Sequence, residues 1–479
     1  MDLASNALSR SPSGLPCQRF DAAGKARVDW RGVWLLAAPM IANNAIQMVL
    51  NLTDTWFVGR ISTTALAAMG AVQWLTFVVI MLFGGVGLAV QTVVAQAFGA
   101  RRYRRASQAT WIGLWATLVA IPLFALIAWL GPWILAPFKL DAHVATLALQ
   151  FWGPRIEGAF LAVALWAVLG FFNGIGRPKL ALWVNCLVGV ANIALNWLFI
   201  VQLQFGIAGS AWATNMAMLL GLAIGVVVFL SSTLHTPYRA RLTWRWQSHL
   251  LWQQWRLGFP MGLMIAADMV GIALFQLMQV RLNEIAGAVT QIVVMLTSLA
   301  YMPAVGIALA GTTLVGQAIG AGDRNWAFRI GNATILLATG YMALAGLALG
   351  LAGPWLLPMF VAANDGHAQE VVRLGLTVIW IAGAYQVFDG LNIASGCCLR
   401  GAGDTTVPAA LVIVLSWFIF APAAHALTFR PGEGWFNLLP QFGLGIVGGW
   451  IALLSYIVLL GLMLLWRWRT RTWEAISID

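Results

Sequence analysis

The sequence predicts an all-α, polytopic membrane protein whose twelve transmembrane helices form two pseudo-symmetric six-helix lobes. Three observations lead to this fold class: an apolar composition, a series of apolar stretches of helix length, and an internal repeat. The chain has 479 residues, of which 61% are hydrophobic and only 9% are charged, and its mean hydropathy is +0.83. A soluble domain of this size is far less apolar than this chain.

The apolar stretches give the number of membrane crossings. Because about 20 apolar residues cross a bilayer as a helix, a chain of 479 residues accommodates roughly ten to fourteen crossings with short connections. Several stretches exceed this minimum length, which predicts tilted or kinked helices. The twelve expected spans are 32–58, 65–97, 107–130, 143–173, 179–201, 207–231, 253–281, 288–319, 327–350, 368–398, 406–427 and 442–467.

The distribution of charge predicts the orientation in the membrane. When the spans alternate between the two sides, most of the 27 lysines and arginines fall on one side, including the run RRYRR at 101–105. The positive-inside rule places this side and both termini in the cytoplasm. The first 31 residues contain no short apolar core ahead of a cleavage site, so we expect no signal peptide. We therefore expect a multi-pass protein of the bacterial inner membrane that binds no nucleic acid.

The internal repeat divides the chain into two lobes. WLLAAPM at 34–40 matches WRLGFPM 221 positions later, and VAQAFGA at 94–100 matches VGQAIGA, again 221 positions later. An even number of helices per lobe makes the repeats parallel, as in transporters that alternate between two open states. The predicted organisation is a cytoplasmic tail (1–31), an N-terminal lobe (32–231), a cytoplasmic connector (232–252), a C-terminal lobe (253–467) and a cytoplasmic tail (468–479).

Three aspartates lie inside the expected spans: Asp54, Asp268 and Asp389. A charged side chain at this depth costs several kcal/mol unless it is paired, solvated or neutralised, which marks such residues as candidate functional sites. The repeat places Gln47 opposite Asp268 and Phe275 opposite Asp54, so each acid is specific to its own lobe.

Polar residues accompany these acids at helical spacing. The alternative role for the amides is to hold neighbouring helices together by hydrogen bonds. The residues are Asn43, Gln47 and Asn51 before Asp54, Asn192 and Asn196 in the fifth span, Gln276 and Gln279 after Asp268, and Tyr385 and Asn392 beside Asp389.

A carboxylate in such surroundings is suited to ion coupling. Burial favours the neutral acid, whereas a bound cation favours the ionised form. The group can therefore hold a proton, a sodium ion or a cationic substrate, but only one at a time. We expect no cofactor, a proton or sodium as the coupling ion, and no metal site apart from a sodium site at Asp268 and Asp389.

Several motifs together resemble the multidrug and toxic compound extrusion (MATE) family. They are LTDTWFVGR (52–60) followed by ALAAMG, VAQAFGA before a basic loop, the 174–200 region with GIGRPK and NIALNWLFI, and LRGAGDTTVP (399–408). The likeness covers about 32–465, and no single motif is specific. It implies a twelve-helix, two-lobe antiporter that expels organic, often cationic compounds against inward proton or sodium flow.

The resemblance also implies roles for individual residues. Asp54 matches the helix-one carboxylate of the family, and Asp268 and Asp389, with Tyr385, match two acidic sites of the NorM-like bacterial branch. Two departures stand out. Asp268 is one methylene shorter than the glutamate usual there, and Asn196 stands where another branch has an aspartate, so it cannot carry a proton.

Other functions are less favoured by the sequence. No metalloprotease, phosphate-binding or nucleophile motif supports a membrane enzyme. A lipid-linked saccharide flippase would need a strongly cationic cavity, whereas arginine and lysine are nearly absent from the span interiors. Glu157, close to Arg155, is expected near the membrane interface. The four cysteines are expected to pack within the fold, and nothing in the sequence requires more than a monomer.

Overall fold

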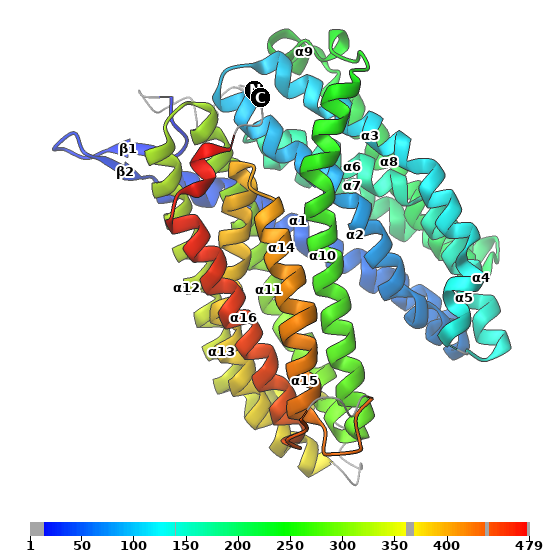
Figure 1. Cartoon of the computed structure of the whole chain (residues 1–479). Coiled ribbons are helices and arrows are strands. Elements are labelled where there is room, and N and C mark those ends of the chain that lie inside the picture. The colour runs from blue at the N-terminus through cyan, green and yellow to red at the C-terminus, as the bar shows by residue number, and fades with distance from the viewer. Residues whose placement is uncertain (1–13, 139, 361–367, 436–439, 477–479) are drawn as a thin grey trace. The chain divides into compact units, whose positions relative to one another are not determined.

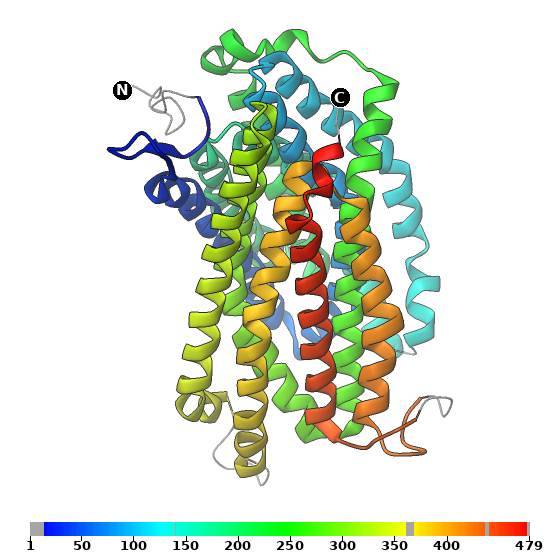
Figure 2. The same cartoon turned by 60° about the vertical axis from the view of Figure 1, so that its left-hand side comes forward.

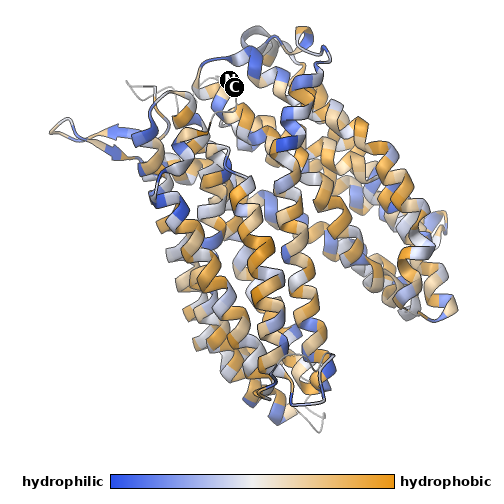
Figure 3. Cartoon of the chain, viewed as in Figure 1, coloured by the Kyte–Doolittle hydropathy of each residue, from blue (hydrophilic) through white to orange (hydrophobic). Residues whose placement is uncertain are grey.

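The computed structural model describes residues 14–138, 140–360, 368–435 and 440–476. Within these ranges, twelve helical segments are long and apolar enough to cross a membrane. Figure 1 labels the helices along the chain. Figure 3 shows apolar residues along the helices and more hydrophilic residues in the connections between them. Part of the predicted N-terminal tail and part of the 427–442 connection lie outside the described residues.

The first repeat contains six spans, four of them unbroken α-helices. The fourth span is interrupted after Glu157, and the fifth ends in a π-helical turn. The elements are α1 (Trp30–Ile61), α2 (Thr63–Gly99), α3 (Tyr103–Trp129), the short α4 (Gly131–Leu135), α5 (Ala142–Glu157), α6 (Ala159–Gly174), α7 (Pro178–Asn196) with its π-helical turn Trp197–Gln202, and α8 (Gly206–Phe229).

The second repeat has the same sequence of spans. A second π-helical turn, Leu415–Phe420, lies at the equivalent place in its fifth span. The elements are α10 (Ser248–Leu282), α11 (Glu284–Gly320), α12 (Arg324–Leu356) extended by a 3-10 turn (Leu357–Phe360), α13 (Ala368–Ala402), α14 (Thr406–Val414), α15 (Ala421–Thr428) and α16 (Gly445–Arg469).

All twelve predicted spans are present, and their ends shift by only a few residues except in the ninth span. That span was predicted to end at 350 and continues as helix and 3-10 turn to Phe360. Apolar side chains such as Leu351 and Trp355 continue the run beyond 350, so the prediction was too short. Hydrophobic periodicity predicts the ends of a helix less well than its presence.

The predicted N-terminal tail contains a β-hairpin that leads into α1, as Figure 2 shows. Its strands β1 (Gln18–Phe20) and β2 (Ala26–Val28) are antiparallel. Asp21 builds the turn, because its carboxylate accepts from the Lys25 amide at 2.9 Å and pairs with Arg27 at 2.9 Å. Asp29 then caps α1. In the connector, α9 (Ser232–Tyr238) precedes α10.

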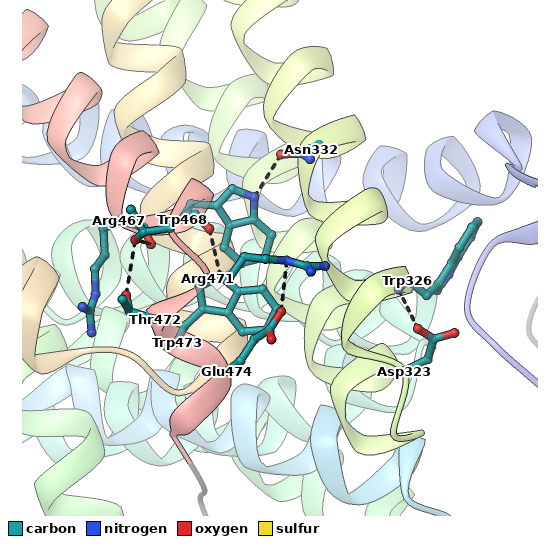
Figure 4. Close-up of polar contacts among 10 residues, drawn as sticks. Asp323, Trp326, Asn332, Arg467, Trp468, Arg471, Thr472, Trp473 and Glu474 are labelled. Carbon is teal, nitrogen blue, oxygen red and sulfur yellow. Dashed lines mark hydrogen bonds and ion pairs between the residues drawn. The ribbon is translucent and has the colours of Figure 1, made fainter.

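The predicted C-terminal tail begins with a turn that packs on the end of α16 (Figure 4). Trp468 donates from its indole nitrogen to Asn332 at 3.0 Å, and the Trp473 ring stacks on it with 4.7 Å between ring centroids. Arg471 and Glu474 form an ion pair at 3.0 Å. The helix end is therefore fixed by aromatic stacking and hydrogen bonds.

The fold comprises two compact units. The first unit contains Met1–Ala266 and Thr312–Ala327, and the second contains Ala267–Gly311 and Phe328–Ser477. The division cuts through α10, α11 and the first turn of α12, so these units differ from the two predicted lobes, whose boundaries stay a prediction. In the first unit, α6 is buried on nearly all sides and packs mainly on α2.

Within the first unit, the repeated VxQAxGA segments of α2 and α11 pack against each other. A Cβ atom added to Gly99 would lie 1.9 Å from the Gln317 carbonyl oxygen, and one added to Gly320 would lie 1.9 Å from the Gln96 carbonyl oxygen. Gln317 also donates to the Gly174 carbonyl at 2.8 Å. The duplicated motif therefore makes a reciprocal backbone contact that requires glycine on both helices.

Candidate functional site

Asp54 lies in the first unit and accepts three hydrogen bonds from neutral donors. Asn196 and Asn192 donate to its Oδ1 at 2.7 and 3.1 Å, and Thr214 donates to its Oδ2 at 2.8 Å. The donors come from α7 and α8, whereas Asp54 is on α1. The structure therefore places both predicted asparagines against the predicted acid.

The local sequence explains this cluster. Asn192 and Asn196 are one helical turn apart, so α7 presents both amides on one face. Within the described residues, the side-chain oxygens of both asparagines are buried without a hydrogen-bond partner. Two amide oxygens and a carboxylate are hard ligands of the kind that sodium or an ammonium group accepts. Thr214 is a member of the cluster that the sequence did not predict, although Thr214 and Asn215 are polar residues within the apolar helix α8.

Asp268 and Asp389 both lie in the second unit. The Tyr456 hydroxyl of α16 donates to Asp268 Oδ1 at 2.8 Å. Asp389 is buried, and on its own helix it accepts from Tyr385 at 3.2 Å and from Asn392 at 3.3 Å. The two carboxylates are close enough for their charges to interact. The predicted Tyr385 and Asn392 are thus beside Asp389, whereas Tyr456 was missed.

Other predicted polar residues do not contact the acids. In the described chain, no hydrogen bond joins Gln47, Asn51 or Gln276 to a candidate carboxylate. Asn43 instead accepts from Asn185, which holds α1 to α7. Gln279 is fully buried and contacts the region of Gly449. For Asn43, the structure agrees with the alternative role of amides that hold helices together.

Arg155 is a further charged residue inside a span. The sequence favours a place near the membrane interface for Glu157; Glu157 and Arg155 both lie near the middle of the span Ala142–Gly174, which does not favour that place. The guanidinium donates to Asn215 Oδ1 at 3.4 Å. The Asn215 amide in turn donates to the Pro154 carbonyl at 2.6 Å, next to the break between α5 and α6.

The π-helical turns lie beside the acidic clusters. The first turn starts directly after Asn196, which donates to Asp54. The second contains Phe420, whose ring stacks on Tyr456 with 5.0 Å between centroids, and Tyr456 donates to Asp268. Such turns are rare and occur frequently at functional sites.

Comparison with known proteins gives a consistent result. The MatE family model matches residues 39–198 and 260–424, one segment in each repeat. The probable multidrug resistance protein NorM of Mesorhizobium japonicum is 30% identical over 464 residues, which cover 93% of this chain and 94% of that protein. The protein of the same name from Burkholderia pseudomallei is 30% identical over 448 residues, covering 91% and 92%.

Solved structures show the same fold. The crystal structure of MATE in the bent conformation matches with a TM-score of 0.80 at 19% identity, covering 92% of this chain and 94% of that one. A MOP superfamily transporter from Pyrococcus furiosus matches with a TM-score of 0.81 at 20% identity, covering 92% and 95%. From the family model and these relatives, we conclude that the chain belongs to the MatE family, whose members are transporters and not enzymes.

Proposed function

We propose that this chain is a multidrug efflux antiporter of the bacterial inner membrane. It exports organic, cationic compounds in exchange for protons or sodium ions, by alternating access between an N-terminal lobe (32–231) and a C-terminal lobe (253–467). The names of the NorM relatives support efflux of several compounds. Both termini are proposed to be cytoplasmic, and the chain to work as a monomer.

One observation carries the coupling proposal. Asp54, Asp268 and Asp389 lie in spans, and within the described residues each meets neutral hydrogen-bond donors rather than an ion-paired lysine or arginine. A carboxylate stabilised in this way makes no ion pair with a described lysine or arginine, so a proton, a sodium ion or a cationic substrate can neutralise its charge.

Competition for these carboxylates couples the two fluxes. An incoming ion that occupies a carboxylate displaces a cationic substrate from it, and the reverse exchange follows on the other side of the membrane. Asp268 and Asp389 form the proposed ion-coupling pair, with Tyr385 and Asn392 in support. Asp54, supported by Asn192 and Asn196, forms the second cation-handling site. Gln47, Asn51 and Gln276 are proposed as polar lining.

Transport in a purified system tests this function. The protein is reconstituted into liposomes loaded with ethidium, and its efflux is driven separately by an imposed proton gradient and an imposed sodium gradient. We expect one of the two gradients to drive efflux, with protein-free liposomes as the control. An absence of efflux under both gradients would contradict the antiporter.

The same assay tests the candidate acids. Asp268→Asn and Asp389→Asn are each expected to abolish coupled efflux while the protein still reaches the membrane, because each change removes a carboxylate but keeps the shape. Asp54→Asn is expected to cause a severe loss. Normal ion-driven efflux by any of these variants removes that residue from the proposed site.

A further inference from the structure

The connector between the two repeats runs over α3 before it enters α10. We call residues 240–247 the connector segment; it is a short 3-10 turn followed by extended chain. The indole nitrogen of Trp111 donates to the Ala240 carbonyl at 2.8 Å, and that of Trp115 donates to the Trp244 carbonyl at 2.9 Å. Two hydrogen bonds from α3 therefore hold the backbone of this segment, and both α3 and the segment belong to the first unit.

The two tryptophans of α3 place this contact close to the expected membrane interface. The predicted third span begins at 107, and Trp115 follows that residue by eight positions, which is roughly 12 Å along a helix. Its side chain leans back toward the start of α3, as helical side chains do. Trp111 is closer still to that start. We therefore expect the connector segment to meet lipid headgroups.

The connector segment presents apolar rings and a cation together. Trp244 and Trp246 are 56% and 52% exposed, and Arg245 between them is exposed as well. The Trp246 ring packs edge-on against Trp115 with 5.8 Å between centroids, so it is held in place although it is exposed. Tryptophan favours the membrane interface, because its ring is apolar and its N–H is polar. An arginine between two such rings is placed at the depth of the headgroup phosphates.

The charge that these elements carry is entirely positive. No aspartate or glutamate occurs in residues 55–140 or 158–267, and these two ranges contain α3, the connector and the start of α10. Arg104 adds to the charge of Arg245, because it precedes Trp111 by seven positions and so lies on the same face of α3. Its side chain is exposed. Such a surface attracts an anionic partner.

The backbone of the connector segment offers further donors. Within the described residues, the amides of Trp244, Arg245 and Trp246 donate no hydrogen bond. A backbone N–H close to the hydrocarbon needs an acceptor, because little water reaches it there. Phosphate oxygens accept from backbone amides and, in stronger bonds, from a guanidinium. A lipid phosphate therefore matches both the amides and the arginine.

We propose that the connector segment binds an anionic phospholipid in the leaflet at the start of α3. Arg245 and the neighbouring amides hold the headgroup phosphate, Arg104 adds positive charge, and the rings of Trp244 and Trp246 pack on the glycerol and the upper acyl chain. A soluble polyanion would leave those rings in water, which favours a lipid as the partner. None of these residues belongs to the Asp54 cluster, and the site does not depend on the proposed efflux function.

Photo-cross-linking tests this site without any transport assay. Purified full-length protein is placed in phosphatidylcholine nanodiscs with a trace of phosphatidylglycerol that carries a diazirine near the head of one acyl chain. After irradiation, mass spectrometry identifies the labelled peptides. We expect the label to concentrate in the connector segment and the start of α3. Unlabelled phosphatidylglycerol should displace it, whereas added phosphatidylcholine or inorganic phosphate should not.

Variants at exposed positions locate the headgroup. Arg245→Gln is expected to weaken the apparent affinity for phosphatidylglycerol roughly fivefold, the usual contribution of one arginine near a membrane surface. The double variant with Arg104→Gln should weaken it roughly 25-fold on the same basis. Arg245→Lys keeps the charge and should stay closer to the wild type. Arg469→Gln, exposed in the last turn of α16 in the second unit, is the matched control and should change nothing.

Several results would overturn the proposal. Label spread evenly over all the helix ends, or displaced equally by phosphatidylcholine, would show general lipid contact only. An unchanged affinity in the double variant, with a melting temperature equal to that of the wild type, would exclude the two arginines. An equal loss in Arg469→Gln would point to overall charge. Displacement by inorganic phosphate or by polyglutamate would assign the connector segment to a soluble anion or an acidic protein instead.

Discussion

Tyr456 donates to Asp268 at 2.8 Å, whereas Asp54 receives three such bonds. A carboxylate with one donor depends on that donor more strongly than one with three. The sequence could not pair these residues, because the acid and its donor are 188 positions apart. The sequence does identify the acids, because a charged residue within an apolar span is rare and easily recognised.

Tyr456→Phe is expected to reduce ion-driven efflux about tenfold at subsaturating ion concentration, because one hydrogen bond to a charged group is lost. The ring and its stacking on Phe420 remain, so folding should be kept. The measurement is ethidium efflux from liposomes at several ion concentrations. Tyr341→Phe on α12 is the matched control. Equal loss in both variants would argue against a role specific to Tyr456.

Cys17 gives a prediction that depends on pH. Burial and, to a smaller extent, the nearby negative charge of Asp29 raise the pKa of this thiol to about 12. A raised pKa in the folded state favours the neutral thiol, so its contribution to stability is present below pH 9 and is lost as the pH rises toward 12. Iodoacetamide should leave Cys17 unmodified in native protein at pH 8 and alkylate it after denaturation. Rapid alkylation of native protein, seen by mass spectrometry, would contradict the burial.

At the scale of elements, the transmembrane helices were predictable and their irregularities were not. Twenty apolar residues form a strong local signal, so all the spans were found. The break after Glu157 lies beside a contact of Asn215 with the Pro154 carbonyl, and the first π-helical turn follows Asn196, which contacts Asp54. Those contacts join residues that are distant in sequence, so the periodicity of apolar residues cannot predict them.

The reciprocal crossing of α2 and α11 leads to a prediction at this scale. Gly99→Ala and Gly320→Ala each add a methyl group 1.9 Å from a carbonyl oxygen, so the helices must move apart. Overpacking of this kind costs about 1–3 kcal/mol, which should lower the melting temperature in detergent by several degrees. Gly70→Ala on α2 meets no atom within 4 Å and is the control. A melting temperature equal to that of the control would show that the crossing is not tight.

For the whole molecule, the distribution of arginine predicts the orientation. Residues 101–105 and the last turn of α16 are rich in arginine, whereas the connection between α3 and α5 has little basic charge. A C-terminal fusion to green fluorescent protein should therefore fluoresce in a bacterial host. Alkaline phosphatase fused after Leu140 should be active, since this enzyme folds only outside the cytoplasm. The reversed pattern would invert the proposed orientation.

The paired π-helical turns have a consequence for the history of the chain. One extra residue in a turn rotates everything after it by roughly 100° around the helix axis. Both repeats keep this rotation, at Trp197–Gln202 and at Leu415–Phe420, although their acids stand at unrelated positions. The simplest evolutionary history is that the π-helical turn was already present in the ancestral sequence before it was duplicated. Each half then acquired its own carboxylates around an inherited irregularity.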